Sequence, residues 1–278
     1  MQRRDFIKNS LCISCMGVFA SGCKNLFKNN TEIDMKNSRF IYKSKDELPK
    51  KVRLEVCSLC QLKCPACAIR LQESQMPKDW LGYLKFSDFK KFIDENNFIE
   101  EIEISNNGEV FLNPEFNKII EYAFEKGVKL TALGGTNLNT VSDKTLENLV
   151  KYQFKLLRVS IDGATAETYK IYRRGGDFNT VINNIKKINE FKKKYNSEYP
   201  RLTYQFILFG HNEHEIEKAK KLAKELKMEI KFTKNTYDNN YSPLKNKAQV
   251  EKQTGLKINF YSQNELACNK IFQKPQIK

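Results

Sequence analysis

The 278-residue sequence lacks an apolar run long enough to span a bilayer, and its cysteines are absent from the positions that a disulfide framework needs. Half-cystines that staple a secreted fold are spread along the chain, where they close long loops. Here four of the eight cysteines fall within Cys57 to Cys67, three lie in the first 23 residues, and Cys268 stands alone. So tight a cluster favours a metal site over disulfides.

Acidic residues are outnumbered, because 33 Asp and Glu face 48 Lys and Arg and leave a net charge of +15. Such an excess suits an acidic partner, a nucleic acid or an anionic membrane surface. Basic runs such as Lys186 to Tyr195 carry no interleaved platform of stacking aromatics, so solvated helix faces explain them better. No nucleic-acid partner is expected. The 40% of apolar residues supply a core for one large domain.

The first thirty residues carry three features of an export signal in the expected order. Arg3 and Arg4 open a twin-arginine pattern, Leu11 to Ala20 has the length of a signal's hydrophobic region, and Ala20 to Cys23 resembles a lipobox. The pattern predicts a leader over residues 1–30, with a membrane tether if Cys23 is lipidated. An uncleaved amphipathic leader and a wrongly assigned start codon are the alternatives. A polar linker over residues 31–50 follows.

Strand and helix patterns then alternate six times, which predicts parallel strands joined by right-handed crossovers. The expected strands are Val52–Cys57, Glu101–Ser105, Val128–Leu133, Lys155–Ile161, Leu202–Phe209 and Glu229–Phe232. The expected helices are Phe86–Asn96, Glu115–Lys126, Ser142–Tyr152, Phe178–Tyr195 and Glu213–Leu226. The fold class is therefore α/β, a partial (β/α)6 TIM-like barrel or an open doubly wound sheet, followed by a short irregular C-terminal tail. In either form ligands gather at the carboxyl ends of the strands.

Three cysteines follow the first expected strand directly, with gaps of three and two residues: Cys60, Cys64 and Cys67. This spacing lets three thiolates of one loop bind three corners of an iron–sulfur cube and leaves the fourth iron without a protein ligand. An open coordination position is what makes a metal site reactive. The alternative is a closed zinc or ferredoxin-type site with Cys57 as the fourth thiolate, although cysteine in a buried strand often serves as a small hydrophobe.

The cysteine spacing and its place after the first strand resemble the radical S-adenosylmethionine (SAM) superfamily. The resemblance implies a [4Fe–4S] cluster on Cys60, Cys64 and Cys67, whose open iron chelates SAM. One electron then cleaves the sulfonium bond, and a 5′-deoxyadenosyl radical abstracts a hydrogen atom from the substrate. The sequence departs from the family at Ala66, where an aromatic residue usually packs near the adenine.

Two later motifs add to the resemblance. Asn107, Gly108 and Glu109 follow the second strand in place of a Gly-Gly-Glu pattern, which implies that they line the methionyl end of SAM, with Glu109 accepting from its ammonium. Ser160 ends the fourth strand and Arg173 precedes a double glycine, which resembles the peptide- and protein-modifying branch and implies that both hold the SAM carboxylate. An ordinary Asn-Gly turn and a surface arginine pair are the structural alternatives.

The resemblance assigns a radical SAM core to residues 51–235 and the truncated start of a SPASM-like auxiliary-cluster extension to residues 236–278. Cys268 is then a vestigial ligand or an incidental thiol. The expected partners are a peptide or protein substrate and a flavodoxin- or ferredoxin-like electron donor. Localisation stays open, because the leader points to export while SAM and electron donors are cytoplasmic. A non-catalytic iron–sulfur or zinc protein tethered at the membrane and an inactive remnant are the alternative functions.

Overall fold

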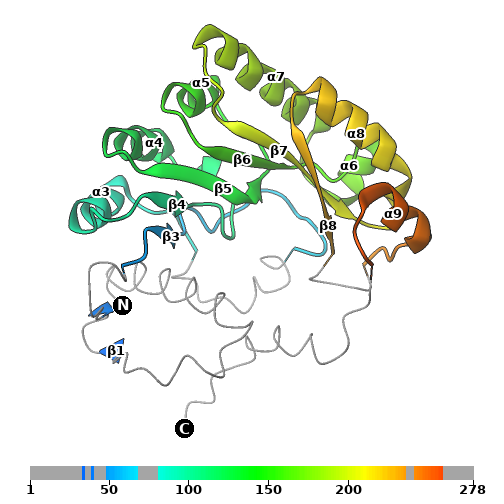
Figure 1. The fold of residues 1–278 in the computed structure, drawn as a ribbon, viewed down its shortest axis with the longest axis horizontal. Coiled ribbons are helices and arrows are strands. Elements are labelled where there is room, and N and C mark those ends of the chain that lie inside the picture. The colour runs from blue at the N-terminus through cyan, green and yellow to red at the C-terminus, as the bar shows by residue number, and fades with distance from the viewer. Residues whose placement is uncertain (1–32, 35–38, 41–47, 68–80, 236–240, 259–278) are drawn as a thin grey trace.

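The computed structural model describes residues 33–34, 39–40, 48–67, 81–235 and 241–258 (Figure 1). Within them, six strands form one sheet in chain order, and every neighbouring pair is parallel. These strands are β3 (Lys51–Arg53), β4 (Glu101–Glu103), β5 (Lys129–Thr136), β6 (Leu156–Ser160), β7 (Arg201–Leu208) and β8 (Glu229–Lys234). The predicted α/β class with six parallel strands is confirmed, and the order agrees with a partial TIM-like barrel.

The crossover helices lie along one side of this curved sheet (Figure 1). They are α3 (Phe86–Glu95), α4 (Phe116–Glu125), α5 (Asp143–Lys151), α6 (Ala166–Tyr172), α7 (Phe178–Lys194) and α8 (Ile216–Glu225). A further helix, α9 (Lys247–Thr254), follows the last strand. The helix ends predicted from the sequence have the expected capping geometry. The Ser142 side chain accepts a hydrogen bond from the Thr145 amide at the start of α5, and Gly127 has a positive φ just after α4.

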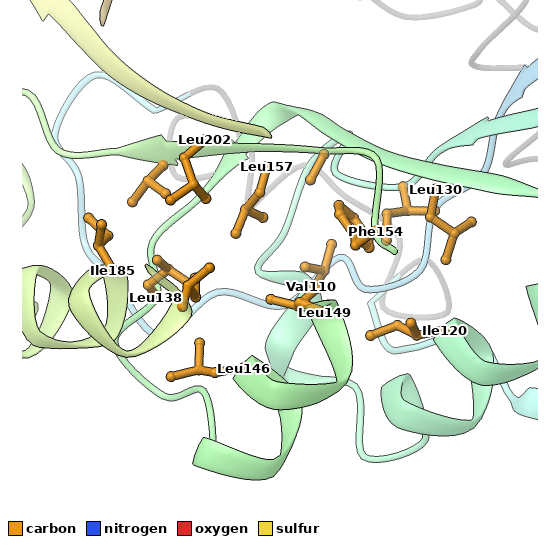
Figure 2. Packing of buried hydrophobic residues seen from close by; sticks show 14 of the residues in the cluster. Val110, Ile120, Leu130, Leu138, Leu146, Leu149, Phe154, Leu157, Ile185 and Leu202 are labelled. Atoms are coloured by element: carbon orange, nitrogen blue, oxygen red, sulfur yellow. The ribbon is translucent and has the colours of Figure 1, made fainter. Parts of the chain in front are cut away.

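The core lies between the sheet and these helices because alternate strand residues turn toward the helices. Ile102, Leu157 and Val159 are fully buried on that face of the sheet. Figure 2 shows Leu157 and Leu202 above the helix residues Leu149 and Ile185. The other face of the same strands carries polar side chains instead.

The structure corrects the sequence-based prediction in four places. Regular β3 is shorter than the predicted strand, since Cys57 makes only an isolated bridge to Tyr83. Helix α6 was missed because its seven residues are too few to show a helical period. Helix α9 stands within the tail that was predicted to be irregular, and it packs on α8. The predicted linker contains a short antiparallel pair, β1 (Ile33–Asp34) with β2 (Arg39–Phe40).

Several predicted features lie outside the described residues. They are the twin-arginine and lipobox patterns with Cys23, and the tail cysteine Cys268. No helix in the described part of the chain combines the length and the apolar character needed to cross a bilayer.

Candidate functional site

The cysteine loop leaves β3 and rests on the loop that follows β4. The amides of Gly108 and Glu109 donate to the carbonyls of Cys57 and Leu59 at 3.1 and 2.7 Å. A Cβ atom at Gly108 would lie 2.4 to 2.6 Å from backbone atoms of Cys57, Ser58 and Leu59. A side chain at this position would therefore push the two loops apart. From the sequence we expected Gly108 to line the SAM site. In the structure the backbone that lies closest to Gly108 is that of the cysteine loop.

The four loop cysteines have different surroundings. Cys64 is buried, Cys67 is half-buried and Cys60 is exposed, whereas Cys57 is fully buried with its Sγ 3.7 Å from the Leu59 carbonyl. Although Cys60 is exposed as a residue, the protein atoms around its thiol displace water and raise its pKa, and the charges of Glu109, Cys64 and Cys67 raise it further. Burial also raises the pKa of Cys57, but the charges that add to it belong to Glu55 and Glu109. The charges of Cys64 and Cys67 therefore act on Cys60, whereas the thiol of Cys57 is buried against the backbone of the loop.

The thiols are not yet arranged around a common centre. Among the described residues, no three His, Cys, Asp or Glu side chains lie close enough together to hold a metal ion as they stand. The loop backbone nevertheless makes hydrogen bonds of its own, since the Lys63 amide donates to the Arg174 carbonyl at 2.8 Å and the Cys67 amide to the Cys64 carbonyl at 3.3 Å. Ligation therefore requires movement of the thiol side chains.

Glu109 lies behind the cysteine loop and is joined to the end of β5. Its Oε2 accepts a hydrogen bond of 2.6 Å from the Asn137 amide, and the carboxyl group is only 2% exposed. Burial raises the pKa of Glu109 to about 7, against the opposing effects of the Asn137 and Phe111 amides and the Arg173 charge. A carboxylate held this way gains strongly from a cationic partner.

Asn137 also connects this carboxylate to the cysteine loop. Its Oδ1 accepts from Gln61 Nε2 at 2.9 Å, and its Nδ2 lies 3.9 Å from Cys60 Sγ. The sequence analysis did not single out Asn137. Its place at the carboxyl end of a strand, directly after Gly134-Gly135-Thr136, was the signal that was available.

Arg173 follows α6 and reaches under the cysteine loop. Its Nε donates to Asp162 Oδ2 at 2.6 Å, its Nη2 makes an ion pair with the same oxygen, and its Nη1 lies 3.7 Å from Cys64 Sγ. Burial alone would lower the pKa of Arg173, but the neighbouring charges of Asp162 and Cys64 outweigh it and raise that pKa. The guanidinium therefore stays charged beside a thiol that iron would ligate.

Asp162 is the second residue that sequence reasoning left without a role. Its side chain is fully buried, and its Oδ1 accepts from the Ile207 amide at 2.6 Å, which ties the loop after β6 to β7. Asp162 adopts a positive φ of 57°, a conformation that Asp tolerates better than most residues. The sequence shows Asp162 directly after a strand and eleven residues before Arg173. It does not show that the two side chains form an ion pair.

Two further predicted residues, Ser160 and Asn107, lie at or just after the ends of strands of the same sheet. Ser160 is buried at the end of β6, and its Oγ accepts a weak hydrogen bond of 3.4 Å from Gln205 Nε2. Asn107 is exposed, and its Nδ2 donates to Glu55 Oε2 at 2.6 Å. The structure thus gathers most of the predicted residues at the carboxyl ends of β3 to β6, and Asn107 meets the site through its contact with Glu55.

Aromatic side chains surround the cysteine loop even though Ala66 is not aromatic. A small buried cluster contains Ala66 with Tyr172 and Phe209, and Tyr241 packs against it. The Tyr172 and Phe209 rings lie 4.5 Å apart, and Tyr241 meets Phe209 edge-on at 5.5 Å. These rings come from α6, the end of β7 and the segment after β8. Aromatic surface beside the third cysteine is thereby supplied from other parts of the chain.

Comparison with known families decides the interpretation of this site. The model of the radical SAM superfamily matches residues 54–223, which is more than half of the chain and includes the cysteine loop. The chain belongs to the radical SAM superfamily. Members of this family use a [4Fe–4S] cluster and SAM.

Two curated relatives cover the core. The antilisterial bacteriocin subtilosin biosynthesis protein AlbA of Bacillus subtilis is 29% identical over 147 residues, or 51% of this chain and 31% of AlbA. A GTP 3′,8-cyclase of Synechocystis is 26% identical over 209 residues, or 72% of this chain and 58% of the cyclase. The chain thus spans less than two thirds of the length of either relative.

Solved radical SAM structures share the fold. The crystal structure of SuiB from Streptococcus suis superposes with a TM-score of 0.58 at 16% identity and covers 81% of this chain and 47% of SuiB. SuiB has also been solved bound to S-adenosylmethionine and bound to the precursor peptide SuiA. At this level of identity the likeness establishes the radical SAM fold.

The residues of the site fit the family's cofactors. Three spaced thiols on one loop, with a fourth buried at the start of that loop, are the donor set of a cluster with one open iron. Arg173 and the buried Glu109 carboxyl lie beside that loop and can supply opposite charges, which matches the carboxylate and ammonium of an amino acid. Both groups are therefore accommodated by side chains that the structure brings together.

Proposed function

We propose that this chain is a radical SAM enzyme that binds a [4Fe–4S] cluster through Cys60, Cys64 and Cys67. The observation that carries the proposal is the difference in surroundings among the loop cysteines: Cys57 is fully buried against the Leu59 carbonyl, whereas the exposed Cys60, Cys64 beside Arg173 and the half-buried Cys67 follow it on the loop. A three-thiolate set leaves one iron open, and an open iron is what distinguishes a reactive cluster from an electron carrier.

The remaining side chains have roles in holding SAM. Glu109 accepts a hydrogen bond from the ammonium group, and the Gly108 backbone fixes the loop that presents it. Ser160 and Arg173 hold the carboxylate, with Asp162 orienting the guanidinium of Arg173 from behind. When bound, the cluster and SAM supply a 5′-deoxyadenosyl radical that takes a hydrogen atom from the substrate.

The substrate of this activity is proposed to be a peptide or protein side chain. The support is the sequence pattern around Ser160 and Arg173, the likeness to AlbA, and the likeness of the fold to SuiB, which has been solved with its precursor peptide. A flavodoxin- or ferredoxin-like donor would supply the electron. The organisation proposed with it is a leader over residues 1–30, a linker, a core over 51–235 and the start of a SPASM-like extension over 236–278.

The experiment that tests the proposal is anaerobic reconstitution of the full chain with iron and sulfide. We expect about four iron and four sulfide per chain, and 5′-deoxyadenosine on addition of reductant and SAM. Cys60→Ala should lose the cluster and the deoxyadenosine. Cys57→Ala is the matched control and should keep the iron, because its thiol is fully buried against the Leu59 carbonyl.

The outcomes separate the proposal from its alternatives. Loss of iron from Cys57→Ala would identify a closed four-thiolate site, and zinc in place of iron would identify a structural metal site. A fully loaded protein that forms no deoxyadenosine would contradict the enzymatic proposal and favour an electron carrier or an inactive remnant.

A further inference from the structure

Two of the three spaced cysteines lie beside a side-chain N–H donor that comes from another part of the chain. The Nδ2 atom of Asn137, after β5, lies 3.9 Å from Cys60 Sγ. The Nη1 atom of Arg173, after α6, lies 3.7 Å from Cys64 Sγ. A protonated thiol is a weak acceptor, so long contacts of this kind are expected for it. Both donors are thus directed at sulfurs that the proposed cluster uses.

The amide group of Asn137 is held in this orientation by its other contacts. The backbone amide of Asn139 can only donate, so the atom that it meets at 3.0 Å is the Asn137 oxygen, which also accepts from Gln61 Nε2 at 2.9 Å. The two N–H groups of Asn137 Nδ2 are therefore left for Gln61 Oε1, at 3.3 Å, and for Cys60 Sγ. The residue is only 4% exposed, and its backbone amide is bonded to Glu109 at 2.6 Å.

The guanidinium of Arg173 is held by a carboxylate. Asp162 Oδ2 accepts from Arg173 Nε at 2.6 Å and pairs with Nη2, and Asp162 Oδ1 is fixed by the Ile207 amide at 2.6 Å. Arginine has five N–H groups, so the contacts with Asp162 and Cys64 leave two for the SAM carboxylate that we assign to Arg173. Burial raises the pKa of Cys64, and the charge and N–H groups of Arg173 oppose that rise.

Iron binding strengthens contacts of this kind. A cysteine that ligates a metal loses its proton, so its sulfur can then only accept hydrogen bonds. A hydrogen bond to an ionised acceptor is roughly twice as strong as one between neutral groups. The Leu62 amide is a further donor to Cys60, since it opposes the rise of the pKa of that thiol. The thiols can turn toward iron about their own side-chain bonds, while the other contacts of Asn137 and Arg173 keep both donors beside the loop.

We propose that Asn137 and Arg173 are positioning residues, which donate N–H groups to two of the sulfurs that bind the cluster and thereby raise its reduction potential. The sulfurs are those of Cys60 and Cys64, respectively. Reduction adds one electron to the cluster, supplied by the electron donor already named, and moves no proton. N–H groups at the sulfurs favour the more negative, reduced form. This inference rests on the proposed function and describes how the same site accepts its electron.

A direct test detects the donor nitrogen atoms. The full chain is reconstituted anaerobically without SAM and reduced, with ¹⁵N either in the side-chain amides of asparagine or in the guanidinium groups of arginine. Pulsed electron paramagnetic resonance of the reduced cluster measures its magnetic coupling to nearby ¹⁵N. We expect a coupling in each sample. Asn137→Ala should remove it from the asparagine sample, and Arg173→Gln should remove it from the arginine sample.

Redox titration of the same SAM-free chain measures the effect on the potential. At a fixed solution potential, the ratio of reduced to oxidised cluster should fall about tenfold in Arg173→Gln, which is a shift of about 59 mV for one electron. The ratio should fall about threefold in Asn137→Ala, because a hydrogen bond from a neutral donor is roughly half as strong. Without SAM in the sample, the proposed contact of Arg173 with the SAM carboxylate does not affect either result.

Two matched controls test whether lost charge or a looser loop could give the same result. Arg174→Gln removes the same charge one residue further along the chain, where the side chain is exposed and water screens it. Asn184→Ala removes another buried asparagine, whose Nδ2 donates to the Leu138 carbonyl at 2.8 Å and so holds the loop of Asn137 from α7. Each control should keep both couplings and change the ratio by less than about twofold.

Three results would overturn this inference: a fully reduced cluster that lacks either coupling, an unchanged ratio in Asn137→Ala or Arg173→Gln, or equal falls in the controls. The couplings in the unchanged chain need no variant, so they are decisive even if a variant fails to fold. A chain that binds no [4Fe–4S] cluster, or that forms no deoxyadenosine once SAM is added, would contradict the proposed function. A cluster that supports deoxyadenosine formation but shows neither coupling would contradict only the present inference.

Discussion

The buried pair of Asp162 and Arg173 gives the sharpest stability prediction. Asp162→Asn keeps the shape of the side chain but removes its charge, and the Arg173 guanidinium then stays in the interior without a counter-ion. The Asp162 side chain is fully buried and that of Arg173 is 12% exposed, so water cannot replace the lost partner. Breaking a buried pair by removing one member costs about 3 to 5 kcal/mol of unfolding free energy.

The expected loss for Asp162→Asn is about 3 to 5 kcal/mol, because asparagine has a single acceptor oxygen, whereas Asp162 uses one oxygen for the Ile207 amide and the other for Arg173. Arg173→Met, which strands the carboxylate instead, should lose a similar amount. The double variant removes both charges, so its loss should be smaller than the sum of the two single losses by more than about 1 kcal/mol.

Urea unfolding of the cluster-free protein, followed by far-UV circular dichroism, measures these free energies. Glu100→Gln is the matched control, because Glu100 pairs with Lys50 at 2.7 Å while both side chains are more than 60% exposed. That variant should lose less than about 1 kcal/mol. Equal losses in Asp162→Asn and Glu100→Gln, or strict additivity in the double variant, would refute this account of the pair.

Two further changes test the loops around the cysteines. Gly108→Ala forces a Cβ against three backbone atoms and should cost about 1 to 3 kcal/mol together with part of the bound iron, whereas Gly127→Ala, which meets no atom within 4 Å, should cost only the strain of its positive φ and keep the iron. Iron analysis and urea unfolding measure the iron content and the stability of both variants. Equal iron contents would contradict the idea that close contact between Gly108 and the cysteine loop is needed for iron binding. Burial raises the pKa of Glu109 from 4.5 to about 7, so the folded state binds the proton of this carboxyl group more tightly than the unfolded state does. The stabilisation that results is about 3 kcal/mol of unfolding free energy. It is fully present below about pH 4.5 and is lost as pH rises through about 7. The stability of Glu109→Gln should therefore fall less than that of the unchanged protein between about pH 5 and about pH 8, and an equally steep fall in urea unfolding would show that Glu109 is not the group responsible.

The sequence was sufficient for the regular part of the fold, because local patterns carry it. Alternation of β-branched runs with amphipathic helices predicted six parallel strands, and Ser142 and Gly127 marked helix ends where the structure has them. Short elements escaped: α6 has seven residues, and α9 stands in polar sequence with one buried residue, Val250. Such short helices are stabilised mainly by tertiary contacts, so the sequence shows no helical periodicity from which to predict them.

For the site, spacing alone selected Cys60, Cys64 and Cys67 and placed them after the first strand, because ligands from one loop are a local property of the chain. The partners of those residues were decided only by the tertiary structure. Asn137 joins Glu109 to the cysteine loop, and Asp162 holds Arg173 from another strand end.

The same division applies to the sheet. Ile102, Leu157 and Val159 are ordinary apolar residues in the sequence, and only the register of the parallel strands puts them on one buried face. The covalent chain fixes which residues can turn to the same face, because side chains alternate along a strand. Which strands then meet, and which buried charges find a partner, depends on contacts between distant segments that no local pattern encodes.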